Sequence, residues 1–198
     1  MATMTRSHHR RSIRLPAYDY AGQGMYFVTI CTQHKACLLG DILGDAMHPN
    51  DAGRMVERWW HELPRKYPTI DIDAYVIMPN HFHGLITIHG SVGADLRSVP
   101  RPQGVGLCVR PALGRPRRVA PTLGNVVAWF KTMCTNEYIR GVTDSGWPAF
   151  AGRLWQRSYY EHIVRNEDDL RRIQEYIANN PARWAEDEEN PAVARPIL

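Results

Sequence analysis

Residues 70–89 read IDIDAYVIMPNHFHGLITIH, and this stretch decides the fold. Both halves are rich in apolar and β-branched residues and a Pro-Asn pair separates them, so we predict strands over Ile70–Met78 and His81–His89 joined by a tight turn. Side chains two residues apart on a strand point to the same side of a sheet, so His81 and His83 project together. Two adjacent imidazoles can bind a metal ion, but they need further ligands from elsewhere in the chain.

The sequence before this stretch predicts a strand and a helix. Met25–Gln33 is β-branched and aromatic, which is typical of a strand. The segment that follows Asp51 has apolar residues at helical spacing, so we predict a helix that Asp51 caps and Pro64 ends.

The sequence after it predicts a helix over Leu123–Arg140, a strand over Leu154–Arg165 and a last helix that Asn166 caps and Pro181 stops. The order is therefore strand, helix, strand, strand, helix, strand, helix. This order predicts an α+β fold, a ferredoxin-like or RRM-like split βαβ arrangement with an antiparallel sheet and helices mainly on one face.

Composition is typical of a single domain with a hydrophobic core. The chain has 198 residues, 44% of them hydrophobic, and a formal net charge of +4. Its four cysteines form no CxxC pair, so we expect neither a zinc ribbon nor a disulfide framework. We expect no secretory signal and no membrane span, and therefore a cytoplasmic, nucleoid-associated protein.

Basic charge is concentrated in two segments. The first 16 residues contain four arginines and no acid, and the stretch from Arg97 to Arg118 contains six arginines and no acid. Arginine pairs with phosphate through two parallel hydrogen bonds, which favours a nucleic-acid partner. We therefore divide the chain into a basic arm (1–24), a domain (25–181) with an Arg/Pro-rich insert (91–121), and an acidic tail (182–198).

The last predicted helix offers partners for the two histidines. Tyr176 and Asn180 are four residues apart and share a helical face, beside an apolar stripe of Leu170, Ile173 and Ile177. An amide oxygen together with two imidazoles makes a mixed site that favours Mg²⁺ or Mn²⁺ over a closed zinc site. Each feature alone is commonly structural; a metal site is predicted only from their combination with the basic segments.

Four separated motifs resemble a known family. The stretch MPNHFHGLI (78–86) resembles the HUH motif of single-tyrosine transposases. YDYAGQGMYFVTICT (18–32), LWQRSYYEHIVRNEDDL (154–170) and YIANNPARW (176–184) resemble the REP-associated tyrosine transposases. The resemblance spans about Arg10 to Trp184, and the insert over 91–121 departs from it.

The resemblance implies a mechanism. Tyr176 would attack a phosphodiester of single-stranded DNA, leaving a 5′-phosphotyrosine and a free 3′-OH, while His81, His83 and Asn180 would hold a divalent ion, Mg²⁺ or Mn²⁺. The covalent bond would allow the strands to be rejoined without ATP. Tyr159 and Tyr160 are rival nucleophiles, disfavoured because they lie within a predicted strand.

The resemblance also implies a partner, namely hairpin DNA of the REP-palindrome type with a flanking single strand. Phosphate clamps and stacking surfaces for it are expected from Arg10, Arg11, Arg14, Tyr18, Lys131, Arg157 and Arg165. We expect the protein to act as a monomer or a homodimer.

Two other functions are compatible with the residues. The fold could bind and regulate palindromic hairpins with little or no catalysis. Alternatively, the paired histidines could act as acid and base in a metal-independent phosphoesterase. The second is disfavoured because such an enzyme would need its histidines in two separate motifs.

Overall fold

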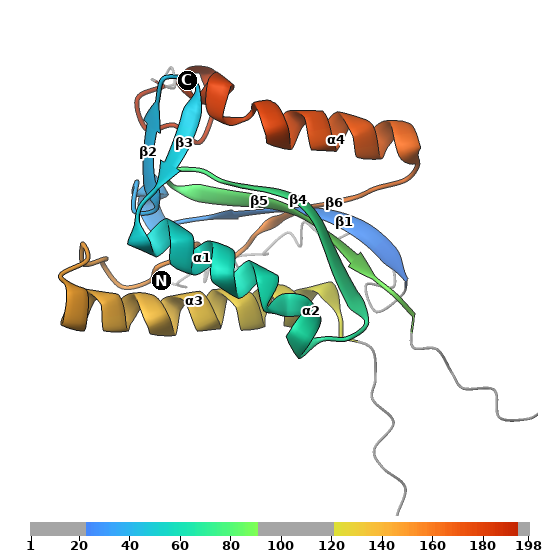
Figure 1. Cartoon of the computed structure of the whole chain (residues 1–198), viewed down its shortest axis with the longest axis horizontal. Coiled ribbons are helices and arrows are strands. Elements are labelled where there is room, and N and C mark those ends of the chain that lie inside the picture. Colours follow the sequence, from blue (N-terminus) through green and yellow to red (C-terminus); the bar gives the residue numbers. More distant parts are fainter. Residues whose placement is uncertain (1–22, 91–120, 194–198) are drawn as a thin grey trace, which may run out of the picture.

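The computed structural model describes residues 23–90 and 121–193, and its centre is an antiparallel sheet of order β4-β5-β1-β6. The four strands are β1 (Gly24–Cys31), β4 (Ile70–Ile77), β5 (His81–Ile88) and β6 (Tyr160–Ile163). The helices are α1 (Asp51–His61), α2 (Leu63–Lys66), α3 (Leu123–Ser145) and α4 (Glu167–Asn179), with two short 3-10 turns, η1 (Gln33–Lys35) and η3 (Pro181–Glu186). The predicted fold class is confirmed, and the predicted elements follow one another in the predicted order, with an additional hairpin before α1 (Figure 1).

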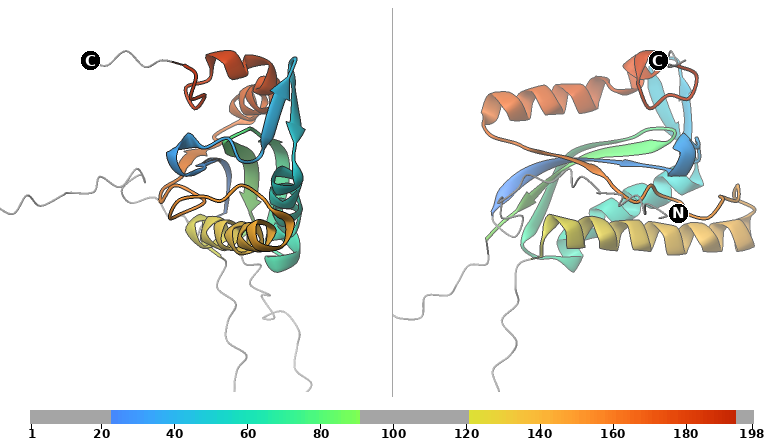
Figure 2. Two further views of the ribbon diagram at one scale, coloured as in Figure 1. Left: turned by 90° about the vertical axis from the view of Figure 1, so that its left-hand side faces the viewer. Right: turned by 180° about the vertical axis from the view of Figure 1, so that it is seen from behind.

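The two faces of the sheet are covered differently. Helices α1, α2 and α3 lie on one face, as predicted, whereas α4 crosses the opposite face (Figures 1 and 2). The larger core includes Tyr26 and Phe82 from the sheet and Trp60 and Phe130 from the helices. On the other face, Ile173 and Ile177 of α4 pack against Phe27 and Leu85. The alternation of β1 and β5 therefore places His81 and His83 on the face that α4 covers.

Helix α1 approaches β5 closely because β5 has a glycine at the point of contact. A Cβ atom at Gly84 would lie 2.5 Å from Cζ2 of Trp60, far inside van der Waals contact. Trp60 is fully buried and its ring packs against Phe82, with 4.6 Å between centroids. Gly84 thus fixes the distance between the helical layer and the strand that carries the histidines.

Several details differ from the sequence predictions. Pro64 does not end the first helix, since α1 already ends at His61 and Pro64 lies in the first turn of α2. Asn50, not Asp51, caps α1, because its side chain accepts a hydrogen bond from the N–H of Gly53. Helix α3 extends to Ser145, where Gly146 in the left-handed conformation ends it. The chain also forms a hairpin that was not predicted, from β2 (Gly40–Leu43) and β3 (Ala46–Pro49).

The predicted strand over Leu154–Arg165 is only partly right, since the strand is limited to Tyr160–Ile163. The carbonyl groups of Gln156, Arg157 and Ser158 accept hydrogen bonds from Nζ of Lys131 instead of pairing in the sheet. Within the described parts of the chain, no helix is both long enough and apolar enough to cross a membrane.

Candidate active site

The two histidines lie side by side on β5 and are almost completely buried. His81 pairs across the sheet with Cys31 and His83 with Thr29, and the centroids of the two rings are 4.5 Å apart. The exposed fraction is 0% for His81 and 3% for His83. The predicted strand therefore brings both imidazoles to one point beneath α4.

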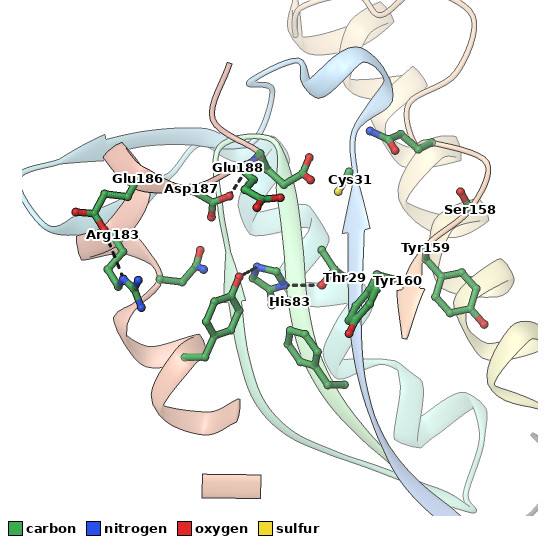
Figure 3. Close-up of a pocket in the computed structure, with 15 residues that line it drawn as sticks. Thr29, Cys31, His83, Ser158, Tyr159, Tyr160, Arg183, Glu186, Asp187 and Glu188 are labelled. Atoms are coloured by element: carbon green, nitrogen blue, oxygen red, sulfur yellow. Dashed lines mark hydrogen bonds and ion pairs between the residues drawn. The ribbon is translucent and has the colours of Figure 1, made fainter. Parts of the chain in front are cut away.

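Each histidine is held through Nδ1. Nδ1 of His83 lies 2.8 Å from Oγ1 of Thr29 (Figure 3), and Nδ1 of His81 lies 2.9 Å from Oδ1 of Asn80. When Nδ1 carries the proton in both rings, Nε2 presents a lone pair, which is the arrangement that metal-binding histidines usually have. Burial lowers the pKa of His83, and the neighbouring His81 adds to this, so the ring stays neutral and able to bind a cation.

Asp187 supplies a carboxylate at the same point. Its Oδ2 lies 3.8 Å from Nε2 of His81, and the ligand atoms of His81, His83 and Asp187 all lie within 4.8 Å of one another. Asp187 directly follows η3, and Trp184 in that turn packs near His81 with ring centroids 6.0 Å apart. Sequence analysis placed Asp187 in an acidic tail and did not include it in the site. The only signal was the run of acids that follows Trp184.

Asn180 brings an amide oxygen to the cluster. It is the last residue before η3 and is 3% exposed, and its Oδ1 is buried without a hydrogen-bond partner among the described residues. Burial lowers the pKa of His81, while Asp187, Glu189 and the Asn180 side chain oppose this effect.

The donor set fits a divalent cation. Nε2 of His81 and Oδ1 of Asn180 are both buried polar atoms that make no hydrogen bond within the described chain, and such atoms are costly unless something binds them. A set of two imidazole nitrogens, one amide oxygen and one carboxylate oxygen is more suitable for Mn²⁺ or Mg²⁺ than for a structural Zn²⁺ ion.

Tyr176 presents its hydroxyl to this cluster from α4. Its Oη lies 3.4 Å from Nε2 of His83, and the two rings are 5.2 Å apart between centroids. The side chain is 42% exposed, so a substrate can reach it. Burial and the charge of Asp187 raise the pKa of Tyr176, whereas the Asn180 side chain and Arg183 act in the opposite direction. The phenol is therefore protonated at neutral pH.

A cavity of 670 Å³ opens over these groups (Figure 3). The cavity is lined by Phe27, His83, Tyr176, Asn180, Gln156, Ser158, Tyr159 and Tyr160, and also by Arg183 and the acids Glu186, Asp187, Glu188 and Glu189. Tyr160 is 52% exposed on the edge strand β6. The two tyrosines that we considered as rival nucleophiles thus line the same cavity, but Tyr176 is the tyrosine with a hydrogen bond to His83.

Three of the predicted DNA contacts lie within the described residues, and none of the three lines this cavity. Lys131 is not part of the cavity wall; its ammonium donates to three backbone carbonyls of 156–158, and burial lowers its pKa to about 8. Arg157 and Arg165 are exposed outside the cavity lining. The other predicted contacts, Arg10, Arg11, Arg14 and Tyr18, and nearly all of the insert lie outside the described residues.

Comparisons with known proteins identify one clear relative. No family model matches the chain. An uncharacterized protein of Haemophilus influenzae is 39% identical over 190 residues, which cover 91% of this chain and 93% of that protein. The chain belongs to the same family as this protein. The chain is also similar to two solved structures at lower identity.

One is a REP-associated tyrosine transposase bound to a REP hairpin, with a TM-score of 0.48 and 19% identity over 81% of this chain and 67% of that chain. The other is a protein of Deinococcus radiodurans named as a transposase, with a TM-score of 0.44 and 17% identity over 84% of this chain and 95% of that chain.

Proposed function

We propose that the protein is a metal-dependent enzyme that cuts and rejoins single-stranded DNA through a covalent bond to Tyr176. The observation that carries this proposal is the contact between a nucleophile and a cation site. The hydroxyl of Tyr176 lies 3.4 Å from Nε2 of His83, near the second histidine, the buried amide oxygen of Asn180 and the carboxylate of Asp187.

The chemistry is a transesterification. The phenolic oxygen of Tyr176 attacks the phosphorus of a phosphodiester, the bond from phosphorus to O3′ breaks, and the strand ends as a free 3′-OH and a 5′-phosphotyrosine. The phenol loses one proton to solvent and the leaving O3′ takes one up, so the step is balanced. Because the new bond is again a phosphodiester, a 3′-OH can attack it and restore Tyr176.

The residues of the site would have different roles. His81, His83, Asn180 and Asp187 would hold the cation, which when bound would polarise the phosphate and stabilise negative charge in the transition state. Thr29 and Asn80 fix the orientation of the two imidazoles. The half-exposed ring of Tyr160 offers a surface on which a base of the single strand can stack.

We propose hairpin DNA of the REP-palindrome type as the substrate, handled in the cytoplasm by a monomer or a homodimer. The support is the sequence resemblance across four motifs and the two arginine-rich segments. A cavity with a nucleophile, a cation site and exposed aromatic rings is compatible with a single-stranded substrate.

The test uses labelled hairpin oligonucleotides from the host genome incubated with Mn²⁺ or Mg²⁺ and separated on denaturing gels. A protein–DNA band should form with wild type and be lost in EDTA and in Tyr176→Phe. Tyr160→Phe is the matched control and should keep the band. Loss of the Tyr176 hydroxyl should not unfold the protein, because its hydrogen bond to His83 is long, at 3.4 Å, and the residue is 42% exposed. A band that persists in Tyr176→Phe would refute the assigned nucleophile.

Two observations favour a second function, a hairpin-binding protein without catalysis. The raised pKa of Tyr176 and the four acids of 186–189 both oppose attack by a phenolate on an anionic phosphate. In that case hairpins are retarded on native gels but form no covalent band with either metal. Cutting that survives EDTA would instead support a metal-independent phosphoesterase.

A further inference from the structure

Asn80 is a fully buried polar residue in the turn between β4 and β5, and every polar atom of its side chain has a partner. Oδ1 lies 2.9 Å from Nδ1 of His81. Nδ2 donates to the carbonyl oxygens of Lys35 at 3.0 Å and Glu189 at 2.7 Å. Asn80 thus contacts one metal-binding histidine and two distant backbone segments.

These partners determine which ring nitrogen of neutral His81 carries the proton. Backbone carbonyls only accept hydrogen bonds, so the two carbonyls fix which end of the Asn80 amide is NH₂. The other end is then the oxygen, which also only accepts. Nδ1 of His81 must therefore donate to it, and Nε2 of the same ring is left with its lone pair.

The same amide holds the segment that carries the carboxylate. Besides the bond from Asn80 to Glu189, Nζ of Lys35 donates to the carbonyl of Glu188 at 2.6 Å and pairs with the carboxylate of Glu189 at 3.1 Å. These contacts hold residues 187–189 against the sheet, with Asp187 facing His81.

We propose that Asn80 is the positioning residue of the cation site, which sets the tautomer of His81 and docks the segment that brings Asp187 to it. This inference rests on the proposed function for the identity of the site, but its test needs neither DNA nor cleavage. Asn80 itself is not a ligand, because its oxygen is used by His81 and its nitrogen by the two carbonyls.

Two variants separate the two roles. Asn80→Asp keeps an acceptor for His81 but loses both donors to the carbonyls, whereas Asn80→Ala loses all three contacts. Asn179→Ala is the matched control, since Asn179 is exposed and bonds only locally to the carbonyl of Glu175. Folding of each variant is checked by circular dichroism.

The first readout is the His81 tautomer in the metal-free protein, from long-range ¹H–¹⁵N correlation spectra. We expect the proton on Nδ1 in wild type and in Asn80→Asp, and a loss of this preference in Asn80→Ala. The second is hydrogen exchange of residues 187–193 by mass spectrometry, which should be faster in both Asn80 variants and unchanged in Asn179→Ala.

The third readout is the affinity for Mn²⁺ alone, measured by calorimetry. Loss of a group that orients a ligand typically weakens metal binding by roughly 10- to 100-fold, and we expect this for Asn80→Ala. A wild-type His81 protonated on Nε2 would overturn the proposal even if the alanine variant failed to fold. So would a folded Asn80→Ala that binds Mn²⁺ as wild type does. Failure of the DNA-cutting assay with these results intact would refute the proposed function and leave this inference standing.

Discussion

The close approach of Gly84 and Trp60 gives the sharpest prediction about the scaffold, and Gly84→Ala is the perturbation. The new methyl would lie 2.5 Å from Cζ2 and 2.7 Å from Cη2 of Trp60, and 2.8 Å from Cε1 of Phe82. Carbon atoms in good contact are about 3.5–4.0 Å apart, so the indole must move by roughly 1 Å. The indole cannot move freely, because Trp60 is fully buried and also packs against Phe130, with 5.6 Å between the ring centroids.

The expected cost follows from two opposing effects. Overpacking a filled core destabilises by about 1–3 kcal/mol. Replacing glycine by alanine reduces the entropy of the unfolded chain and stabilises by about 0.4–1 kcal/mol when the conformation allows it. The φ of Gly84 is not in the left-handed region, so both effects apply. Gly84→Ala should therefore lower the free energy of unfolding by about 1–2 kcal/mol.

The assay is urea unfolding of a double-mutant cycle. Trp60→Phe removes the six-membered part of the indole that carries both clashing atoms, so the second substitution should relieve the first. We expect a favourable coupling energy of about 1 kcal/mol or more between Gly84→Ala and Trp60→Phe. Gly90→Ala is the control, since the nearest atom to its new methyl is 3.8 Å away. Additive effects within about 0.5 kcal/mol would refute the reasoning.

Three other side chains give separate predictions. Thr29→Val removes the hydroxyl that holds Nδ1 of His83 and should weaken Mn²⁺ binding roughly 10-fold in calorimetry, whereas Thr29→Ser should not; equal affinities would contradict the assignment. The pKa of Asp169 is held below its usual value mainly by a hydrogen bond from His162 and then by a backbone N–H. Because the pKa is lowered in the folded state, the ionised carboxylate stabilises the fold above the unfolded-state pKa of about 3.9, and this stabilisation is lost as the pH falls. The loss of stability caused by Asp169→Asn, measured by urea unfolding, should therefore become smaller below about pH 4. A loss that does not change with pH would show that the charge of Asp169 is not its cause. Tyr160→Ala should weaken single-stranded DNA binding by about 1–3 kcal/mol in fluorescence anisotropy while Tyr160→Phe binds normally, and equal losses would implicate the hydroxyl rather than stacking.

Local periodicity was sufficient to predict part of the site. The alternation of β5 placed His81 and His83 on one side, and the helical spacing of α4 placed Tyr176 and Asn180 on one face. Both predictions depend only on residues close in sequence, and the structure brings the two histidines, Tyr176 and Asn180 to the same cavity region. Periodicity does not tell which face of a sheet an amphipathic helix covers, so the position of α4 opposite the other helices was not predicted.

Contacts between distant residues account for what was missed. Asp187 reaches the site because the segment after η3 folds back, and the bonds that hold it span 109 residues to Asn80 and 153 residues to Lys35. The shortened strand has the same kind of cause, since Lys131 on α3 takes the carbonyls of 156–158 out of the sheet. Neither a charge pattern nor a strand propensity contains this information.

The charge of the cavity lining predicts that a cation and DNA, if both bind here, affect each other's affinity. Glu186, Asp187, Glu188 and Glu189 line it, and Arg183 is the one Lys or Arg side chain among its described lining residues. A phosphate that approaches Tyr176 therefore meets carboxylates, and like charges a few ångströms apart repel each other strongly where water is partly excluded. A divalent ion held by the two histidines would offset part of this negative charge and attract the phosphate directly. Each ligand should then tighten the binding of the other by the same factor, about 5- to 150-fold for a coupling of 1–3 kcal/mol. The coupling is measured on Tyr176→Phe, which lacks the proposed nucleophile; an absence of coupling between Mn²⁺ and a hairpin would mean that the DNA does not enter this cavity.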